Sequence, residues 1–276
     1  MLLTGNARLA GIIGWPVAHS RSPRLHGTWL ARHQIDGAYL PLAVAPADLA
    51  SSLAALSRMG FVGANLTIPH KEAGLALCTR LDDSAIRAGA VNTLQFADGA
   101  IIGSNTDGLG FLANLRAHTV DPRTGPALIL GAGGAARAIG AALIDQGVSV
   151  SFCNRSPERA QNLARDFNAT SLDWAQRASA LADYALLINT TSLGMIGHAP
   201  LDLPLDHAPA SMAVADIVYA PLRTPLLAAT AAAGLKAVEG LGMLLHQAVP
   251  GFTAWFGVTP QVDAELYRIV AADLLD

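Results

Sequence analysis

The sequence is poor in charge. Only 14% of its 276 residues are charged and 52% are hydrophobic, whereas roughly 25% of an average globular protein is charged. This balance excludes a disordered chain and predicts large buried cores. The formal net charge is -3 and the basic residues are scattered. Because proteins that grip nucleic acid usually carry a basic patch, we expect no nucleic-acid partner.

Cysteines and uninterrupted apolar runs are also scarce. The two cysteines, Cys78 and Cys153, lack the paired spacing of a disulfide framework or a zinc site, so we interpret both as buried apolar residues. The histidines show no metal-ligand spacing, and no metal is expected. The longest apolar span, residues 125–144, is broken by Arg137 and by four glycines between residues 131 and 140. We therefore expect no membrane helix, and the absence of a targeting signal at the start predicts a cytoplasmic location.

Strands and helices alternate along the N-terminal half. A chain of this length predicts two domains. Alternation of this kind favours a parallel or mixed sheet covered by helices. We expect strands at residues 9–13, 38–44 and 61–66, helices at residues 23–35, after Pro46 and from Pro69, and a hairpin of residues 92–96 and 100–103 that turns at Asp98-Gly99.

A more regular alternation begins near Pro126 and indicates a doubly wound sheet. We expect strands at residues 127–130, 148–153, 185–189, 213–219 and 235–238, and helices at residues 135–146, 157–167 and 225–233. Two final helices, residues 242–256 and 262–275, have no further strand to cover, so we expect them to pack against the first domain. The predicted fold class is α/β, with a mixed sheet in an N-terminal domain and a Rossmann-like sheet in a second.

A glycine-rich turn marks a nucleotide site. The segment PALILGAGGAARAIGAAL, residues 126–143, places Gly131, Gly133 and Gly134 between an apolar strand and an alanine-rich helix. Glycines let the backbone approach the pyrophosphate of a dinucleotide, whose charge meets the amides at the helix N-terminus. Ala136 replaces the third glycine of the usual spacing and still permits close packing. The segment predicts a dinucleotide cofactor.

The following strand favours NADP over NAD. An acidic residue about 20 positions after the glycines would bind the 2'-hydroxyl of NAD, and the strand has none at its end. It ends instead in Asn154, Arg155 and Ser156, with Arg159 one turn later. Two guanidinium groups and a hydroxyl suit a 2'-phosphate.

Three polar segments follow strands or the hairpin in the first domain. They are Ser20-Arg21-Ser22-Pro23, residues 65–71 with Lys71, and residues 105–108 with Asp107. Ligands bind at the carboxyl ends of strands in such sheets, so these side chains predict a site for a small polyol-like ligand. Singly, Ser22 also fits a helix cap, Asn92 a turn, and Lys71 a solvated lysine in the first turn of a helix.

Together the motifs resemble those of the shikimate dehydrogenase family, in family order over nearly the whole chain. The matching segments are HSRSP (19–23), NLTIPHK (65–71), GAVNT (89–93), NTDG (105–108), GAGGAARA (131–138), NRS (154–156) with Arg159, DIVYAPLRTPLL (216–227) and EGLGMLLHQA (239–248). Departures from the family pattern are mild: Leu66 and Ile68 stand for valines, and Ser156 for threonine. Gly27 stands where many relatives have asparagine, which leaves a substrate role there in doubt.

The resemblance implies a reversible, NADPH-dependent reduction of 3-dehydroshikimate to shikimate in aromatic amino acid biosynthesis. It implies a substrate-binding catalytic domain of residues 1–106, completed by the C-terminal helices 241–276, and an NADP-binding domain of residues 107–240. Lys71 and Asp107 would be the catalytic pair. The protein would be a monomer or a homodimer.

The resemblance also implies the residues that bind each ligand. Those for the substrate are Ser20, Ser22, Thr67, Lys71, Asn92, Asp107, Tyr219 and Gln247. Those for the cofactor are Asp83, Gly131, Ala132, Gly133, Gly134, Ala135, Asn154, Arg155, Ser156, Arg159, Thr190, Ser192, Met195, Ile217, Gly240 and Met243.

Three alternatives stay open. A paralogous quinate/shikimate dehydrogenase would share the scaffold and often use NAD, against which the two arginines argue. A catalytically idle NADP-binding regulatory protein would not need an intact Lys71 and Asp107. Another small NADP reductase would lack the NTDG segment and the segment with Gln247.

Overall fold

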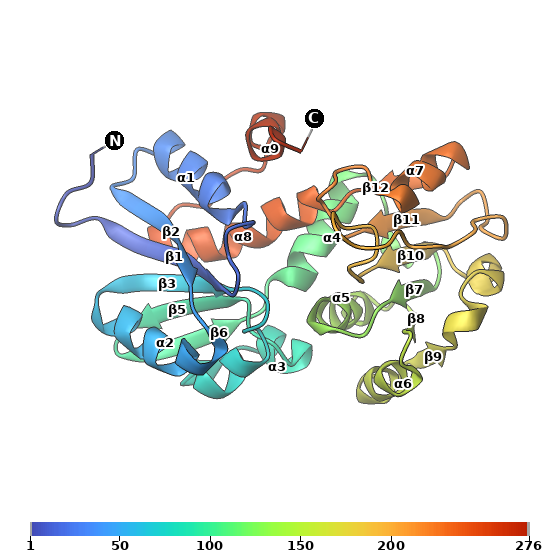
Figure 1. Cartoon of the computed structure of the whole chain (residues 1–276), viewed down its shortest axis with the longest axis horizontal. Coiled ribbons are helices and arrows are strands. Elements are labelled where there is room, and N and C mark those ends of the chain that lie inside the picture. The colour runs from blue at the N-terminus through green and yellow to red at the C-terminus, as the bar shows by residue number, and fades with distance from the viewer. Residues whose placement is uncertain (1, 275–276) are drawn as a thin grey trace. The chain divides into compact units, whose positions relative to one another are not determined.

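The computed structural model describes residues 2–274 and divides into two compact units (Figure 1). The first unit comprises the residues up to Asp107 together with Leu245–Ala272, and the second comprises Gly108–Leu244 and the last described residues. Each unit has its own six-stranded sheet. Which ligand each unit holds stays a prediction at this point.

The first sheet is mixed, as expected. Its order is β2 (Gly37–Ala43), β1 (Arg8–Gly14), β3 (Phe61–Leu66), β5 (Thr93–Ala97), β6 (Ala100–Ser104) and β4 (Arg80–Leu81). β1 runs parallel to β2 and β3, whereas β5 is antiparallel to both of its neighbours. The hairpin prediction is confirmed: Asp98 and Gly99 both have positive φ, 51° and 75°, as the two-residue turns that suit strand twist require. β2 is an edge strand and contains Pro41.

Helices cover both faces of this sheet. α1 (Ser22–Arg32), the part of α8 (Leu241–Phe256) that belongs to this unit and α9 (Ala264–Ala271) lie on one face. The indole N–H of Trp255 in α8 donates to the carbonyl of Leu94 at 2.9 Å. α2 (Leu49–Arg58) and α3 (Asp83–Ala88) cover the other face, where Leu53 and Ala85 share a buried apolar cluster with Leu66.

The second sheet is fully parallel and doubly wound. Its order is β12 (Lys236–Val238), β11 (Ala213–Asp216), β10 (Leu186–Asn189), β7 (Ala127–Leu130), β8 (Val150–Cys153) and β9 (Thr170–Leu172). α4 (Asp107–Ala117), α5 (Gly134–Asp145) and α6 (Pro157–Asp166) pack on one face. α7 (Pro225–Ala232) packs on the other. The chain changes direction of winding between β7 and β10, which is where such sheets bind ligands. The predicted fold class is confirmed.

Several local predictions were wrong. The segment from Pro69 forms only a five-residue 3₁₀ helix, Ala73–Leu77, whose second residue, Gly74, lies close against Leu66. The strand expected to reach Tyr219 ends at Asp216, whose side chain accepts the backbone N–H of Val218 and turns the chain. The prediction missed α3, α4, β4 and β9 altogether. The two strands have only two or three residues, too few to show an alternation.

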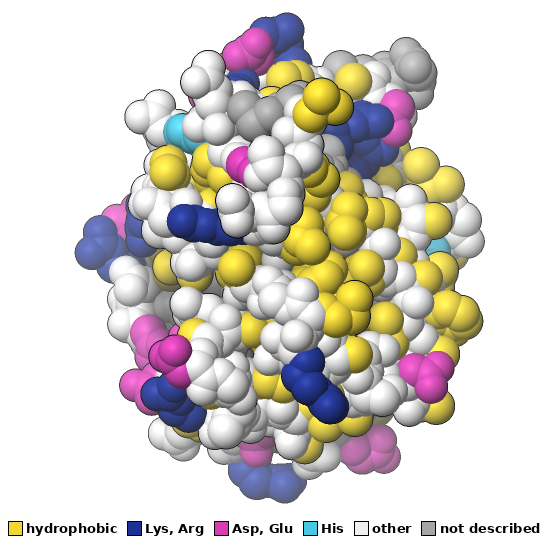
Figure 2. Space-filling model, turned by 90° about the vertical axis from the view of Figure 1, so that its left-hand side faces the viewer, with side chains coloured by type: hydrophobic (Ala, Val, Ile, Leu, Met, Phe, Trp, Pro, Cys, Tyr) yellow, Lys and Arg dark blue, Asp and Glu magenta, His cyan; other side chains and the backbone are white. Residues whose placement is uncertain are grey.

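The surface reflects the low charge of the sequence. Figure 2 shows apolar side chains gathered across one face, with lysines and arginines scattered around them. Exposed large hydrophobic residues of the first unit include Trp15, Leu40, Met59 and Ile68. None of the helices in residues 2–274 has the length and apolar character needed to cross a membrane.

Candidate active site

The structure brings Lys71 and Asp107 together within the first unit. The ammonium nitrogen of Lys71 lies 2.6 Å from Oδ2 of Asp107. The lysine side chain is 25% exposed and the aspartate side chain 6%, so the carboxylate is enclosed while the lysine is partly open to solvent. Within residues 2–274 the ammonium has no other hydrogen-bond partner. A lysine carries three N–H donors, and two therefore stay available for a ligand.

Asp107 is held by backbone and side-chain groups around it. It is the first residue of α4, where the helix dipole favours a negative charge. Its N–H donates to Oδ1 of Asn105 at 3.0 Å, and Asn105 in turn donates to the carbonyl of Ala90. Its Oδ1 accepts a hydrogen bond from Nδ2 of Asn92 at 2.8 Å. Both carboxylate oxygens are thus engaged, which fixes the orientation of the group.

Asn92 is the centre of this cluster rather than a simple turn residue. Its side chain is buried and its Nδ2 also lies 3.3 Å from Oε1 of Gln247 in α8. Its Oδ1 accepts the backbone N–H of Thr106 at 2.9 Å. Four residues predicted to bind substrate, Lys71, Asn92, Asp107 and Gln247, are therefore joined by direct contacts.

Ser20 and Ser22 lie together where α1 begins. The N–H of Ser22 donates to Oγ of Ser20 at 3.3 Å. α1 has Arg21 at its N-cap and no side-chain cap, so the interpretation of Ser22 as a helix cap is wrong. Its side chain instead interacts with the phenol of Tyr39, whose pKa it lowers against the larger rise that burial causes. Thr67 is half-buried beyond β3, and its hydroxyl has no hydrogen-bond partner within the described residues.

Sequence reasoning missed four buried residues of this site, which connect the predicted ones. They are Tyr39, Asn65, Thr93 and Thr106. Asn65, Thr93 and Thr106 stand inside the motifs NLTIPHK, GAVNT and NTDG, so their position in those motifs was a usable signal. Tyr39 is an ordinary strand former, and no sequence pattern distinguishes it.

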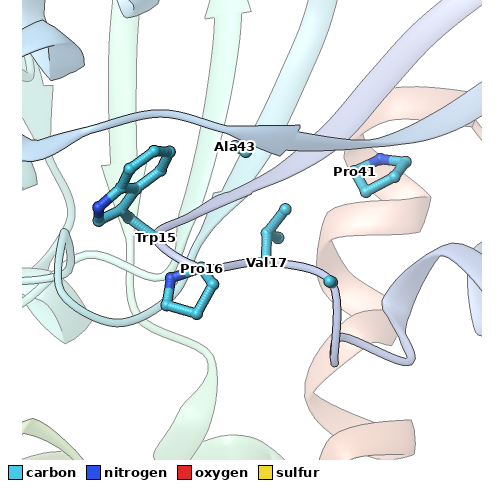
Figure 3. Close-up of a pocket in the computed structure, with 6 residues that line it drawn as sticks. Trp15, Pro16, Val17, Pro41 and Ala43 are labelled. Atoms are coloured by element: carbon cyan, nitrogen blue, oxygen red, sulfur yellow. The ribbon is translucent and has the colours of Figure 1, made fainter.

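A cavity of about 390 Å³ lies beside the loop that leads from β1 to Ser20 (Figure 3). It is lined by Trp15, Pro16, Val17, Ala18, Pro41 and Ala43. None of the predicted site residues lines it, and its wall has no charged side chain. Such a lining does not suit a hydroxylated acid, and we do not assign the cavity to the substrate.

The glycine turn of the second unit has the features of a phosphate cradle. Gly131 has φ of +115° and lies close against Thr190, so a side chain there would be strained and would collide. Gly133 is the N-cap of the 12-residue α5 and provides no side-chain cap. A side chain built at Gly133 would meet nothing within 4 Å. The first amides of α5 therefore face open space, as a bound pyrophosphate requires.

Two arginines stand beside this turn. Arg159 is exposed on α6 and its Nη2 lies 3.4 Å from the carbonyl of Ala132. Arg155 is exposed and makes no hydrogen bond or ion pair within the described residues. Asn154 donates to the carbonyl of Ser156, which shapes the turn between β8 and α6. A phosphate dianion fits this corner.

The other predicted cofactor residues of the second unit, apart from Met243 in α8, follow strands of its sheet. Thr190, Ser192 and Met195 follow β10, Ile217 follows β11, and Gly240 follows β12. These strands are parallel, so their carboxyl ends share one edge with the glycine turn. Gly240 lies so close to the carbonyl of Ile217 that a side chain would not fit.

Two predicted residues do not lie in the same unit as their expected companions. Asp83 is exposed at the start of α3, in the first unit. Tyr219 lies beyond β11, in the second. The cofactor role of Asp83 and the substrate role of Tyr219 stay predictions.

A second buried cluster lies at the carboxyl ends of β10 and β11. The Oδ1 atom of Asp216 accepts from Asn189 at 2.9 Å, and its Oδ2 accepts from the hydroxyl of Thr224 at 2.7 Å. Burial raises the pKa of Asp216 to about 6, although these hydrogen bonds oppose the rise.

Burial also raises the pKa of both Cys78 and Cys153 to about 11, which keeps their thiols protonated and unreactive. Within residues 2–274, no three or more His, Cys, Asp or Glu side chains gather in a way that could hold a metal.

Comparison with protein families places this geometry in a known context. Residues 12–94 match the shikimate dehydrogenase substrate binding domain, residues 115–196 match shikimate / quinate 5-dehydrogenase, and residues 240–264 match the shikimate 5'-dehydrogenase C-terminal domain. The shikimate dehydrogenase (NADP(+)) of Acidiphilium cryptum is 70% identical over the full length of both chains. The chain belongs to the shikimate dehydrogenase family.

Solved structures of the shikimate dehydrogenase family agree with the fold. The Thermus thermophilus shikimate 5-dehydrogenase, solved in complex with NADP(H) and shikimate, is 37% identical, with a TM-score of 0.88 over 97% of this chain and 99% of that one. The quinate dehydrogenase of Corynebacterium glutamicum, solved with NAD, is 28% identical, with a TM-score of 0.88 over 98% and 99% of the two chains. The predicted family is confirmed.

Proposed function

We propose that this chain is an NADP-dependent oxidoreductase that acts on a CH–OH group and reversibly reduces 3-dehydroshikimate to shikimate, in the pathway to aromatic amino acids. The contact that carries the proposal is the 2.6 Å pair of Lys71 and Asp107, set in a buried amide and hydroxyl cluster. The name of the relative at 70% identity, shikimate dehydrogenase (NADP(+)), supports the substrate and the cofactor.

In the proposed mechanism Lys71 serves the oxygen at C3 of the substrate. NADPH, when bound, supplies a hydride to the carbonyl carbon. The ammonium of Lys71 hydrogen-bonds the carbonyl oxygen and donates a proton to it as negative charge develops there. Asp107 orients the ammonium and stabilises its charge, while Asn92 keeps the carboxylate in place. In the reverse direction the same lysine withdraws the proton.

The remaining predicted residues have binding roles in this proposal. Ser20, Ser22, Thr67 and Gln247, with Tyr219 from the second unit, hold the carboxylate and hydroxyls of the substrate. In this proposal residues 1–106 and 241–276 form the substrate domain, and residues 107–240 form the NADP domain.

The cofactor proposal is supported by the second unit. The uncapped N-terminus of α5 and the open space at Gly133 fit a pyrophosphate. Asn154, Arg155, Ser156 and Arg159 would hold the 2'-phosphate, and no acidic side chain stands where NAD would need one. Asp83 and the residues after β10, β11 and β12 would complete the site.

Quinate is the second candidate substrate, because one matching family model covers both shikimate and quinate enzymes and a quinate dehydrogenase shares the fold. Purified protein is assayed with shikimate and with quinate, each against NADP and NAD. We expect the highest kcat/KM for shikimate with NADP. Higher kcat/KM for quinate with NAD would favour the second candidate, and no activity in any combination would favour an idle regulatory protein. A cytoplasmic location and a monomeric or homodimeric state complete the proposal.

A further inference from the structure

Tyr39 occupies a special place in the first unit, although no motif includes it. It lies in β2 with 6% of its surface exposed. Its hydroxyl donates to Oδ1 of Asn65 on β3 at 2.5 Å and also interacts with the side chain of Ser22 on α1. Since β1 separates β2 from β3 in the sheet, the long tyrosine side chain links a helix to a strand that is not its neighbour.

The ring of Tyr39 is held as firmly as its hydroxyl. The imidazole of His26 stacks on it with ring centres 4.0 Å apart and planes 8° apart. His26 is fully buried and neither ring nitrogen has a hydrogen-bond partner within the described residues. Burial lowers the pKa of His26 to about 3, so the ring is neutral and acts as an aromatic surface. His26 follows Ser22 by four residues, and α1 thus presents one face to both ends of the same tyrosine.

From Asn65 the hydrogen bonds continue to the catalytic pair. The Nδ2 of Asn65 donates to Oγ1 of Thr93 at 3.1 Å, and Thr93 donates to Oδ1 of Asn92 at 2.9 Å. Asn92 then donates to Asp107. An unbroken path of buried hydrogen bonds therefore joins the Tyr39 hydroxyl, beside Ser22, to the carboxylate that holds Lys71.

We propose that Tyr39, stacked on His26, is a positioning residue that sets the distance between the serine end of the substrate site and the Lys71–Asp107 pair. This inference rests on the proposed function. A rigid cyclic substrate must meet binding groups at one end and the proton donor at the other, and small errors in such a placement cost large factors in rate. A satisfied buried network is a suitable device, because each member constrains the next.

The first test is Tyr39→Phe, which keeps the stacked ring and removes the hydroxyl. We expect KM for shikimate to rise roughly tenfold, because Asn65 and Ser22 both lose the buried hydroxyl that they contact. KM for NADP should change less than about twofold. Tyr184→Phe, which removes a tyrosine hydroxyl of the second unit that has no hydrogen bond within the described residues, is the matched control. A lower melting temperature with unchanged KM for shikimate would show a merely structural role and overturn the inference.

A double-mutant cycle with Ser22→Ala tests the route. If Tyr39 acts through Ser22, adding Tyr39→Phe to Ser22→Ala should raise KM by less than about threefold, instead of the full factor seen in the wild-type background. Factors that multiply would show that Tyr39 acts independently of Ser22, against the inference.

A second variant tests the path if Tyr39→Phe does not fold. Thr93→Val keeps the side-chain shape and removes the hydroxyl that links Asn65 to Asn92. We expect kcat with shikimate to fall roughly tenfold while the circular dichroism spectrum is unchanged. Unchanged kcat and KM would overturn the inference. The wild type separates the two failures: an inactive wild type refutes the proposed function, whereas an active wild type with insensitive variants refutes only the role of Tyr39.

Discussion

The predicted sites of the two units are built from different kinds of chemical group. In the first, the site consists of buried side chains that bond one another, with Asn92 and Asp107 only 2% and 4% exposed. In the second, it consists of glycine backbone, an uncapped helix end and exposed arginines. The first arrangement is complete before a ligand arrives, whereas the second leaves donors that a ligand would satisfy.

The difference fits what each site is proposed to recognise. Hydroxyls at fixed positions on a ring need donors and acceptors at fixed positions, which a packed network provides. Phosphates carry charge on many oxygens, and backbone amides with flexible guanidinium groups suit them without such exact placement. Conservative changes should therefore damage the first site and only weaken the second.

The largest effect is expected at Lys71. Lys71→Ala should lower kcat roughly 10²–10⁴-fold, the usual contribution of a general acid, while KM for NADP and the melting temperature stay near those of the wild type. Steady-state kinetics and thermal unfolding check this. Lys236→Ala, which changes the only other lysine of the chain, should behave as wild type. Near-normal turnover of a folded Lys71→Ala would refute the mechanism and the contrast between the units.

Asp216 tests whether the contrast between the two units holds, because it belongs to a buried network of side chains within the second unit. Its folded pKa of about 6 lies above the ordinary aspartate pKa of 3.8, so the folded state binds the proton more tightly than the unfolded state does. The stability from this group is complete below about pH 4 and is lost as pH rises through 6. The side chain of Asp216→Asn cannot titrate, so its unfolding free energy lacks this loss. Relative to wild type, the unfolding free energy of Asp216→Asn should therefore rise by on the order of 3 kcal/mol as the pH increases from 4 to 7.

Urea unfolding at several pH values measures this difference, with the exposed Asp202→Asn as control. A constant difference between wild type and Asp216→Asn across that range would contradict the prediction. We expect kcat at fixed pH to be unaffected, because this network supports the fold rather than the chemistry.

The two glycines of the turn should separate folding from binding. Gly131→Ala places a side chain at φ of +115° against Thr190 and should cost about 1–3 kcal/mol of unfolding free energy. Gly133→Ala meets no neighbour, so its stability should be within about 0.5 kcal/mol of wild type, while KM for NADP rises because the methyl group enters the cradle. Equal stability losses in both variants would argue against an open cradle at Gly133.

The smallest effect is expected at the exposed arginines. Arg155→Ala should raise KM for NADP roughly tenfold, the factor for one charge-assisted hydrogen bond at an exposed site, and leave KM for NAD nearly unchanged. Arg165→Ala, on the same helix as Arg159 and also exposed, is the control. If KM for both cofactors rises equally, Arg155 does not select the 2'-phosphate.

The sequence predicted those parts of the molecule whose signal is local. The glycine turn, the polar strand ends and the hairpin at Asp98 can each be identified from a pattern of a few consecutive residues. α4 was missed because its sequence, DGLGFLANLRA, contains two glycines that lower helix propensity. Gly108 is needed there, since it lies against the carbonyl of Ala138 in α5. That contact joins residues far apart in sequence, and no local pattern reveals it.

The links inside the candidate site are non-local as well. Tyr39 and Asn65 are 26 residues apart, and they meet only because β2 and β3 both pair with β1. A tyrosine in a strand otherwise indicates nothing beyond β propensity. The motifs therefore gave the residues proposed to contact ligands, whereas no local pattern marked Tyr39, which joins them from a neighbouring strand.

Pro41 has a consequence for assembly. It lies in the edge strand β2 and pairs with Ile12 of β1, and proline has no amide hydrogen to offer a further strand. A strand from another molecule could not continue the hydrogen-bond ladder past this position. Pro41 therefore disfavours edge-to-edge aggregation of the sheet through β2. Any twofold association of this protein should accordingly use side-chain surfaces and not a continuous intermolecular sheet through β2.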